Sequence, residues 1–236
     1  MSCRVAMLRM QEDGLIRLPP PRNGNGNGRP YRRRTPEAQP ELFPVVTSVG
    51  ALSDLQLDPV EHPKASHLWN EYIDRYHYLG YQPLPGAQLR YFATANGTVL
   101  ALMGFGAAAW KTAPRDRFIG WTSEQRRKKL HLVVNNARFL ILPWVQCKYL
   151  ASRLLSMVTR RLPEDWQRRY GYRPVLAETF VEIPRFQGTC YKAANWIHLG
   201  KTQGRGKLDV HHTAYLPTKS IWVYPLVKDF QLKLCD

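Results

Sequence analysis

The sequence contains few acidic residues. Asp and Glu number 18 against 34 Lys and Arg, so the formal net charge is +16 and the isoelectric point is about 10. Such an excess indicates an anionic partner, and nucleic acid is the most common one. A generally basic protein without that partner is the alternative. With 44% hydrophobic and 11% aromatic residues, the chain can still bury a sizeable core.

Cysteine is also scarce. The chain has four cysteines, and no two of them form a CxxC pair. This spacing argues against a zinc site and against a disulfide framework, so we expect reduced, partly buried thiols and no metal. The four are Cys3, Cys147, Cys190 and Cys235.

Long hydrophobic runs are absent. No apolar stretch approaches the ~20 residues that span a bilayer. The N-terminal segment lacks the continuous apolar core of a secretory signal. We therefore expect a cytoplasmic protein without membrane contact.

Residues 1–45 differ in composition from the rest. They combine prolines, Asn-Gly repeats and the run Arg32–Arg34, without apolar periodicity. Glycine and proline at this density cannot bury enough surface to offset the entropy of ordering. We predict a flexible basic tail followed by a single domain over residues 46–236.

Hydrophobic periodicity within the domain predicts alternating helices and strands. Asn96-Gly97 marks a hairpin turn, because both turn positions need positive φ. Pro163 either breaks a helix or starts a second one. The result is an α/β (α+β) fold with a mixed central sheet flanked by helices. The expected helices cover 62–80, 122–136, 147–170 and 188–200, and the strands lie within 88–106, 137–143, 173–183 and 220–226.

This element order, with the strand–helix run of 137–200, resembles the N-acetyltransferase (GNAT) fold. The resemblance implies that two neighbouring strands part and hold the pantetheine arm of acyl-CoA. It also implies that the pyrophosphate lies on the first amides of the next helix. In the motif Gln/Arg-x-x-Gly-x-Gly/Ala, Tyr149 replaces the first glycine and obstructs close backbone approach, which weakens the case for acyl-CoA. The implied cofactor positions are Leu142, Gln146, Tyr149, Leu150, Ala151 and Ser152.

A second resemblance covers roughly residues 62–226. The chain is similar to the Druantia anti-phage protein DruA family, which is associated with phage-defence clusters and transposon-like genes. The resemblance implies that setting and brings no established reaction. It rests on these segments in the family's order: YHYLG, RDRFIGW, NNARFLILP, LASRLL, ETFVEIPRFQGTCYKAANWIHLGKTQGRGK and WVYPL.

Three residues are candidates for catalysis. Glu178 is the lone charge in an apolar strand, and such a charge is costly to bury unless it is paired or used. The GNAT resemblance implies that it is a general base and that Tyr191 protonates the departing thiolate. A buried ion pair between Glu178 and Arg138 is the alternative. Asp116 lies between two arginines, so it should stay ionised and either orient a ligand or tie a loop to the body.

Two cationic segments are candidates for binding nucleic acid. One is a predicted helix with four consecutive cations, and the other is the glycine-rich loop 200–207, which lacks the order of a P-loop. Solvated surface is the alternative for both. The candidate residues are Arg126, Arg127, Lys128, Lys129, Lys201, Arg205 and Lys207.

The leading hypothesis is a nucleic-acid-associated component of an anti-phage or transposon-linked system. It would bind DNA through a basic surface, with other defence-system proteins as further partners. A GNAT-like transferase that modifies nucleic acid or protein is the second hypothesis. A catalytically inactive scaffold is the third.

Overall fold

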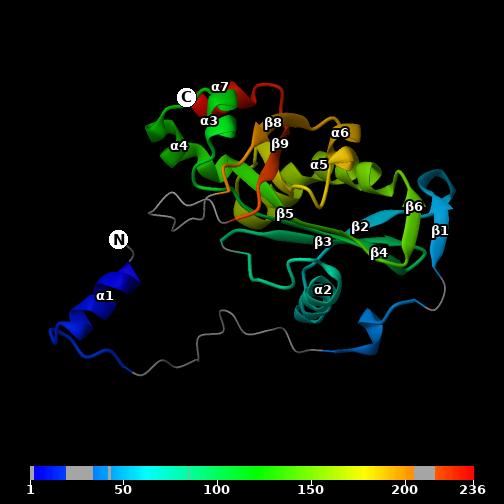
Figure 1. Ribbon diagram of the computed structural model, residues 1–236, viewed down its shortest axis with the longest axis horizontal. Helices are drawn as coiled ribbons and strands as arrows, with labels where there is room; N and C mark the ends of the chain where they lie inside the picture. Colours follow the sequence, from blue (N-terminus) through cyan, green and yellow to red (C-terminus); the bar gives the residue numbers. More distant parts are fainter. Residues whose placement is uncertain (1–2, 20–33, 42–43, 85, 205–215) are drawn as a thin grey trace. The chain divides into compact units, whose positions relative to one another are not determined.

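The structure is a computed structural model that describes residues 3–19, 34–41, 44–84, 86–204 and 216–236. By its internal contacts the chain divides into two units, residues 1–30 and 31–236. The first unit contains the helix α1 (Cys3–Glu12). The second contains the sheets and the remaining helices (Figure 1).

The main sheet has seven strands in the order β2-β3-β4-β5-β7-β9-β8, and a small parallel sheet pairs β1 with β6. Neighbours in the main sheet are antiparallel except for β5 and β7, which are parallel. The expected fold class, α/β with a mixed central sheet flanked by helices, is confirmed. The strands are β1 (Val45–Ser48), β2 (Gln56–Pro59), β3 (Leu89–Ala95), β4 (Thr98–Ala107), β5 (Val133–Ile141), β6 (Val145–Lys148), β7 (Leu176–Glu182), β8 (Ile197–Lys201) and β9 (Lys219–Pro225).

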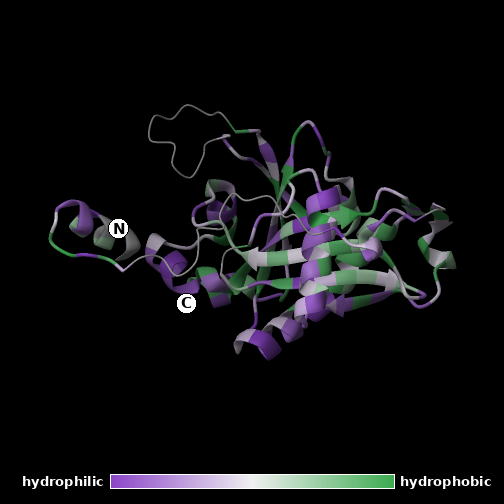
Figure 2. Ribbon diagram, turned by 90° about the horizontal axis from the view of Figure 1, so that it is seen from below, coloured by the Kyte–Doolittle hydropathy of each residue, from purple (hydrophilic) through white to green (hydrophobic). Residues whose placement is uncertain are grey.

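Two long helices cover opposite faces of the sheet (Figure 1). Arg90 of β3 donates a hydrogen bond to Asn70 in α2, whereas its neighbour Tyr91 donates one to Asp165 in α5. Because successive side chains of a strand point to opposite faces, α2 and α5 lie on different sides. Figure 2 shows α2 lying across the strands with hydrophilic residues on its outer side. The helices of this unit are α2 (Pro63–Tyr76), α3 (Ala113–Ile119), α4 (Ser123–Lys129), α5 (Leu150–Tyr170), α6 (Thr189–Ala193) and α7 (Phe230–Cys235).

Residues 34–41 pack against α2. The Thr35 amide and hydroxyl both donate to the Glu71 carboxylate, and the Tyr72 hydroxyl donates to a main-chain oxygen at 2.6 Å. Ala38 is fully buried. Residues 34–41 therefore pack on the same unit as α2, whereas the division into a tail over residues 1–45 and a domain over residues 46–236 stays a prediction. Flexibility of the preceding segment stays a prediction.

Several element boundaries differ from the expected ones. The helix expected over 122–136 ends at Lys129, and the β-branched pair Val133 and Val134 already belongs to β5. The helix expected over 188–200 is a single turn, α6, followed by the edge strand β8. Gly200 lies in that strand and caps no helix. Pro163 neither starts nor ends a helix, since α5 runs through it.

The hairpin prediction is confirmed, because Asn96 and Gly97 form the turn between β3 and β4 with φ of 50° and 78°.

In the part of the chain that the structure describes, no helix has the length and apolar character needed to cross a bilayer.

Candidate functional site

Strands β5 and β7 part after a short paired segment. They are paired only at Val133 with Leu176, Val134 with Ala177 and Asn135 with Glu178. Beyond that point β5 stays paired with β4 as far as residue 141, and β7 stays paired with β9 as far as residue 182. The two parallel strands therefore diverge like the arms of a fork.

The gap between the arms holds a cavity of about 610 Å³, which we call the slot. This volume lies within the range of pockets that bind small molecules. Its walls come from β5, β7, the start of α6 and the segment that follows α2. Its polar lining includes His77, Asn136, Arg138, Thr179, Glu182 and Tyr191.

Hydrogen bonds close the base of the fork. The Thr179 hydroxyl donates to the Asn136 carbonyl at 3.0 Å, and the Tyr191 hydroxyl donates to Asn136 Oδ1 at 2.8 Å. Asn136 Nδ2 donates in turn to the main-chain oxygens of Gly104 and Arg138. Burial raises the pKa of Tyr191, so its hydroxyl keeps the proton at neutral pH.

A cation and a neutral imidazole line the slot beside this network. Arg138 Nη1 donates to the adjacent Ala137 carbonyl at 2.8 Å, and its buried Nε has no hydrogen-bond partner in the part of the chain that the structure describes. Burial lowers the pKa of Arg138. Burial and the nearby Arg138 charge lower the pKa of His77 to about 4, so His77 is neutral at pH 7. His77 Nδ1 accepts a hydrogen bond from the Leu79 amide.

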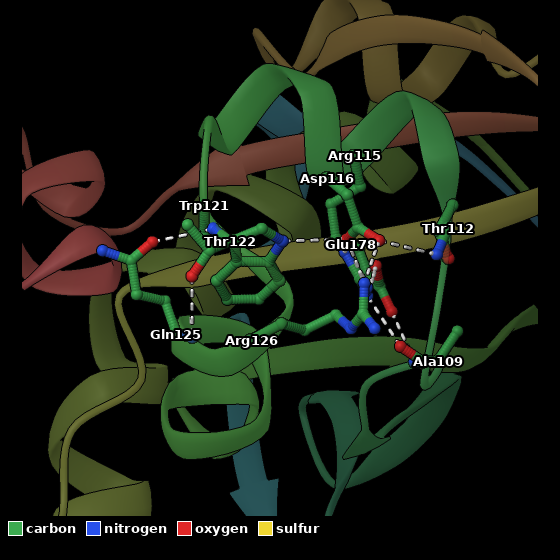
Figure 3. Close-up of polar contacts among 9 residues, drawn as sticks. All are labelled: Ala109, Thr112, Arg115, Asp116, Trp121, Thr122, Gln125, Arg126 and Glu178. Carbon is green, nitrogen blue, oxygen red and sulfur yellow. Dashed lines mark hydrogen bonds and ion pairs between the residues drawn. The ribbon is translucent and has the colours of Figure 1, made fainter.

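Glu178 lies in a separate network on the other face of β7 (Figure 3). Its Oε2 is 2.9 Å from Arg115 Nη1, its Oε1 accepts from the Ala109 amide, and the side chains of Glu178 and Arg115 have no exposed surface. The structure thus shows Glu178 in a buried ion pair, but its partner is Arg115 and not the Arg138 named in the alternative. Arg115 was missed because it comes from α3, 63 residues earlier in the chain.

Asp116 belongs to the same network as Glu178. Its Oδ1 accepts from Arg115 at 2.8 Å and from the Trp121 indole at 3.1 Å, and its Oδ2 lies 3.3 Å from Arg126 Nη1 (Figure 3). The segment RDRFIGW therefore ties α3 and α4 together. Asp116 is not among the residues that line the slot.

The structure brings one of the three catalytic candidates into the slot. The Thr179 side chain points from β7 toward Tyr191 of α6. The Glu178 side chain points to the opposite face of β7, where it contacts Arg115 of α3. Glu178 and Tyr191 therefore do not form an acid–base pair in a single site. Sequence reasoning missed the polar lining at Asn136, for which its position within an apolar strand was the available signal.

The expected cofactor positions are spread over several environments. Ala151 lines the slot, whereas Leu142 and Leu150 are each 1% exposed and belong to the core. Gln146 lies in β6, and the Ser152 hydroxyl donates to the carbonyl of the preceding turn. Tyr149 caps α5 in the left-handed region at φ 65° with its side chain 76% exposed. It thus adopts the glycine-like backbone but does not line the slot.

The residues expected to contact nucleic acid also lie in different surroundings. Arg126 is engaged by Asp116 and lies over the Trp110 ring, and Lys128 pairs with Glu124 at 2.9 Å. Arg127 is exposed and Lys129 is half-buried. Arg205 and Lys207 lie outside the described residues.

Lys201 lines a second cavity of about 740 Å³ beside the slot. Lys192 and His198 line the same cavity, and Phe186 and Gln187 line both cavities. The two hollows are therefore neighbours that share a wall.

The chain is similar, at low identity, to several solved acetyltransferases. The polyamine N-acetyltransferase of Drosophila melanogaster matches with a TM-score of 0.44 and 13% identity, over 73% of this chain and 100% of that chain. An N-acetyltransferase from Staphylococcus aureus Mu50 matches with a TM-score of 0.44 and 8% identity, over 74% of this chain and 99% of that chain. No curated protein matches the sequence.

The sequence itself is more informative than these distant structural likenesses. The family described as Druantia protein DruA matches residues 10–219, which is most of the chain. That match includes the segments RDRFIGW and ETFVE, which contribute Arg115, Asp116, Trp121 and Glu178 to the network of Figure 3. The chain belongs to the Druantia protein DruA family.

Proposed function

We propose that this DruA-family chain is a group transferase of an anti-phage system, and that its donor lies in the slot between β5 and β7. The observation that carries the proposal is the divergence of these strands after three residue pairs. Parted strands expose main-chain donors and acceptors along both walls, which suits an extended ligand with amide groups. The volume of about 610 Å³ is sufficient for such a ligand.

The chain's own residues support a transfer reaction at the base of the fork. Tyr191 holds a proton there, and its hydroxyl is fixed by the Asn136 side chain at 2.8 Å. A fixed, protonated phenol suits a general acid that protonates a leaving group. His77 is neutral at pH 7 and lines the same slot, so it replaces Glu178 as the candidate base.

Some features of the chain suit acyl-CoA, and one feature does not. The slot suits the pantetheine arm, and the first amides of α5 have no intrahelical partner and suit a phosphate. The backbone at Tyr149 has the left-handed conformation that a glycine would supply. The strand β6, however, stands between β5 and α5 and pairs with β1. When bound, acyl-CoA would supply an activated acyl group.

The test is calorimetry with acetyl-CoA on the wild-type chain and on Ala137→Phe, which fills the slot from β5. Ala193→Phe on the exposed side of α6 is the matched control, because it adds the same ring outside the slot. We expect saturable binding by the wild type and the control and at least tenfold weaker binding by Ala137→Phe. Equal affinity in all three proteins would refute donor binding in the slot.

A second function, binding of nucleic acid, is favoured by a different observation. Lys192, Lys201 and Lys219 have no ion pair among the described residues, in contrast to Lys128. Lys192 and Lys201 line the second cavity, and Lys219 lines the slot. We call these three residues the lysine cluster. A nucleic acid bound by the lysine cluster would pass the mouth of the slot. We propose that this nucleic acid is DNA and that other proteins of the defence system are further partners.

Salt dependence tests this second proposal. Each phosphate contact contributes about 0.9 to the slope of log affinity against log salt for duplex DNA. The double variant Lys192→Gln/Lys201→Gln should lower that slope by about 1 to 2, whereas Lys128→Gln should leave it nearly unchanged because Lys128 already has a partner. An affinity that does not depend on salt, or an equal loss in both variants, would contradict DNA binding through the cluster.

A further inference from the structure

Arg138 is a largely buried cation in the wall of the slot. Its Nη1 donates to the Ala137 carbonyl, and its buried Nε has no hydrogen-bond partner among the residues that the structure describes. Among the described residues no carboxylate forms an ion pair with it. The guanidinium therefore has N–H donors that no acceptor in the described ranges satisfies.

Other largely buried arginines have side-chain partners for their guanidinium groups. Arg115 has two carboxylates within 2.9 Å, from Asp116 and Glu178, and Arg75 has Glu71 at 2.8 Å. Burying a charge without such a partner is costly, so an unpaired buried cation points to a use outside folding. Arg90 also lacks a carboxylate within the described part of the chain, but its Nη1 and Nη2 donate to the side chains of Asn70 and Ser66 at 2.8 Å. Arg138 has no such side-chain partner among the described residues, and it lines a cavity large enough for a ligand.

The surroundings of Arg138 favour an anion. His77 is neutral at pH 7, and the acid of the slot, Glu182, lies 3.5 Å from Arg185. Lys219 adds a second cation to the lining. The uncompensated charge of the slot is therefore positive.

We propose that Arg138 binds a phosphate group of the molecule that accepts the transferred group in the slot. The guanidinium presents paired N–H donors that match a phosphate. The lysine cluster favours phosphate over carboxylate, because it continues the cationic lining from the slot into the second cavity, as a phosphate chain requires. The assignment of the phosphate to an acceptor rests on the proposed function, whereas the phosphate site itself does not.

The test compares Arg138→Met with Arg160→Met, an exposed arginine of α5 that lines neither cavity. The probe is inorganic phosphate, titrated at constant ionic strength, with acetate as the carboxylate probe and thermal melting as the measurement. We expect phosphate to raise the melting temperature of the wild type and of Arg160→Met. In Arg138→Met the apparent affinity for phosphate should fall at least about tenfold, because the charged donors are lost.

Two further measurements separate a binding role from a structural role. Without any ligand, Arg138→Met should melt higher than the wild type, because methionine removes an unpaired buried charge and keeps the apolar stem. In the wild type, bound phosphate should raise the pKa of His77 above about 4 in an NMR titration, because it offsets the Arg138 charge. Arg138→Lys keeps the charge and should retain part of the phosphate response.

The results that overturn the proposal are distinct from those that overturn the transferase. A lower melting temperature for Arg138→Met together with an unchanged phosphate response would overturn it. A response to acetate equal to that to phosphate would overturn the choice of phosphate. Failure of acetyl-CoA to bind refutes the donor site but leaves the phosphate titration intact. Acetyl-CoA binding without any phosphate response refutes the phosphate site alone.

Discussion

Arg115 Nη1 and Glu178 Oε2 lie 2.9 Å apart, and neither side chain has any exposed surface. The pair joins α3 to the middle of β7, close to the point where β7 leaves β5. The Ala109 amide and carbonyl complete the hydrogen bonds of both groups. This pair therefore holds the fork in place from the face opposite the slot.

Removal of one partner should be strongly destabilising. For Glu178→Ala we expect the free energy of unfolding to fall by about 3 to 5 kcal/mol, because Arg115 is left buried and uncompensated. Chemical denaturation measures this directly. Glu164→Ala, at an exposed pair with Arg173, is the control and should change stability by less than about 1 kcal/mol. Similar small losses in both variants would show that the buried pair is dispensable.

Loss of the phenol at the base of the fork should cost less. Tyr191→Phe leaves Asn136 Oδ1 buried without its donor, so we expect a loss of about 1 to 3 kcal/mol in urea unfolding. Tyr224→Phe removes a hydroxyl that has no hydrogen-bond partner within the described ranges, and it should be nearly neutral. If the two variants have the same free energy of unfolding, the hydrogen bond from Tyr191 to Asn136 does not stabilise the junction of β5 and β7.

In contrast to the two substitutions above, replacement of Tyr149 by glycine is expected to stabilise the protein. Its φ of 65° is unfavourable for a side chain, and its ring is 76% exposed, so little packing is lost on truncation. Tyr149→Gly should raise the free energy of unfolding by up to about 1 kcal/mol, whereas Tyr149→Ala keeps the backbone strain and should not. Thermal melting of the pair distinguishes them, and equal melting temperatures would count against strain at this helix start.

His77 should make stability depend on pH. Its folded-state pKa of about 4 lies below the ordinary value of 6.5, so protons bind the unfolded chain more readily between those values. The stabilising contribution is present above pH 6.5 and is lost as the pH falls to about 4. We expect a loss of about 1 to 3 kcal/mol over this window in urea unfolding. His77→Gln should flatten the profile there, and an unchanged profile would contradict burial of the neutral imidazole.

The sequence predicted the elements that carry strong local signals. Asn96-Gly97 identified the hairpin because its turn chemistry is local, and the apolar spacing from Leu68 to Tyr76 identified α2. The edge strand β8 was missed because Gly200 is equally suited to end a helix. Likewise, Val133 and Val134 are compatible with a helix until their pairing with β7 is known.

The candidate site was less accessible to sequence reasoning, because it depends on contacts between distant segments. The slot was expected from the resemblance, but the partner of Glu178 was not, since Arg115 and Glu178 are 63 residues apart. Strand alternation puts Glu178 and Thr179 on opposite faces of β7, but alternation alone does not indicate which face borders the slot. His77 carried no signal, because its low pKa comes from burial beside Arg138.

The donor site and the phosphate site are both proposed to lie in the slot, which exists because β5 and β7 diverge. Residue-specific amide hydrogen exchange tests this divergence most directly. We predict slow exchange for the amides of residues 133–135. Over residues 136–141 we predict slow exchange only for the amides that bond to β4, because the others face the slot. Uniformly slow exchange along all of β5 would mean that the strands stay joined, and it would contradict the slot.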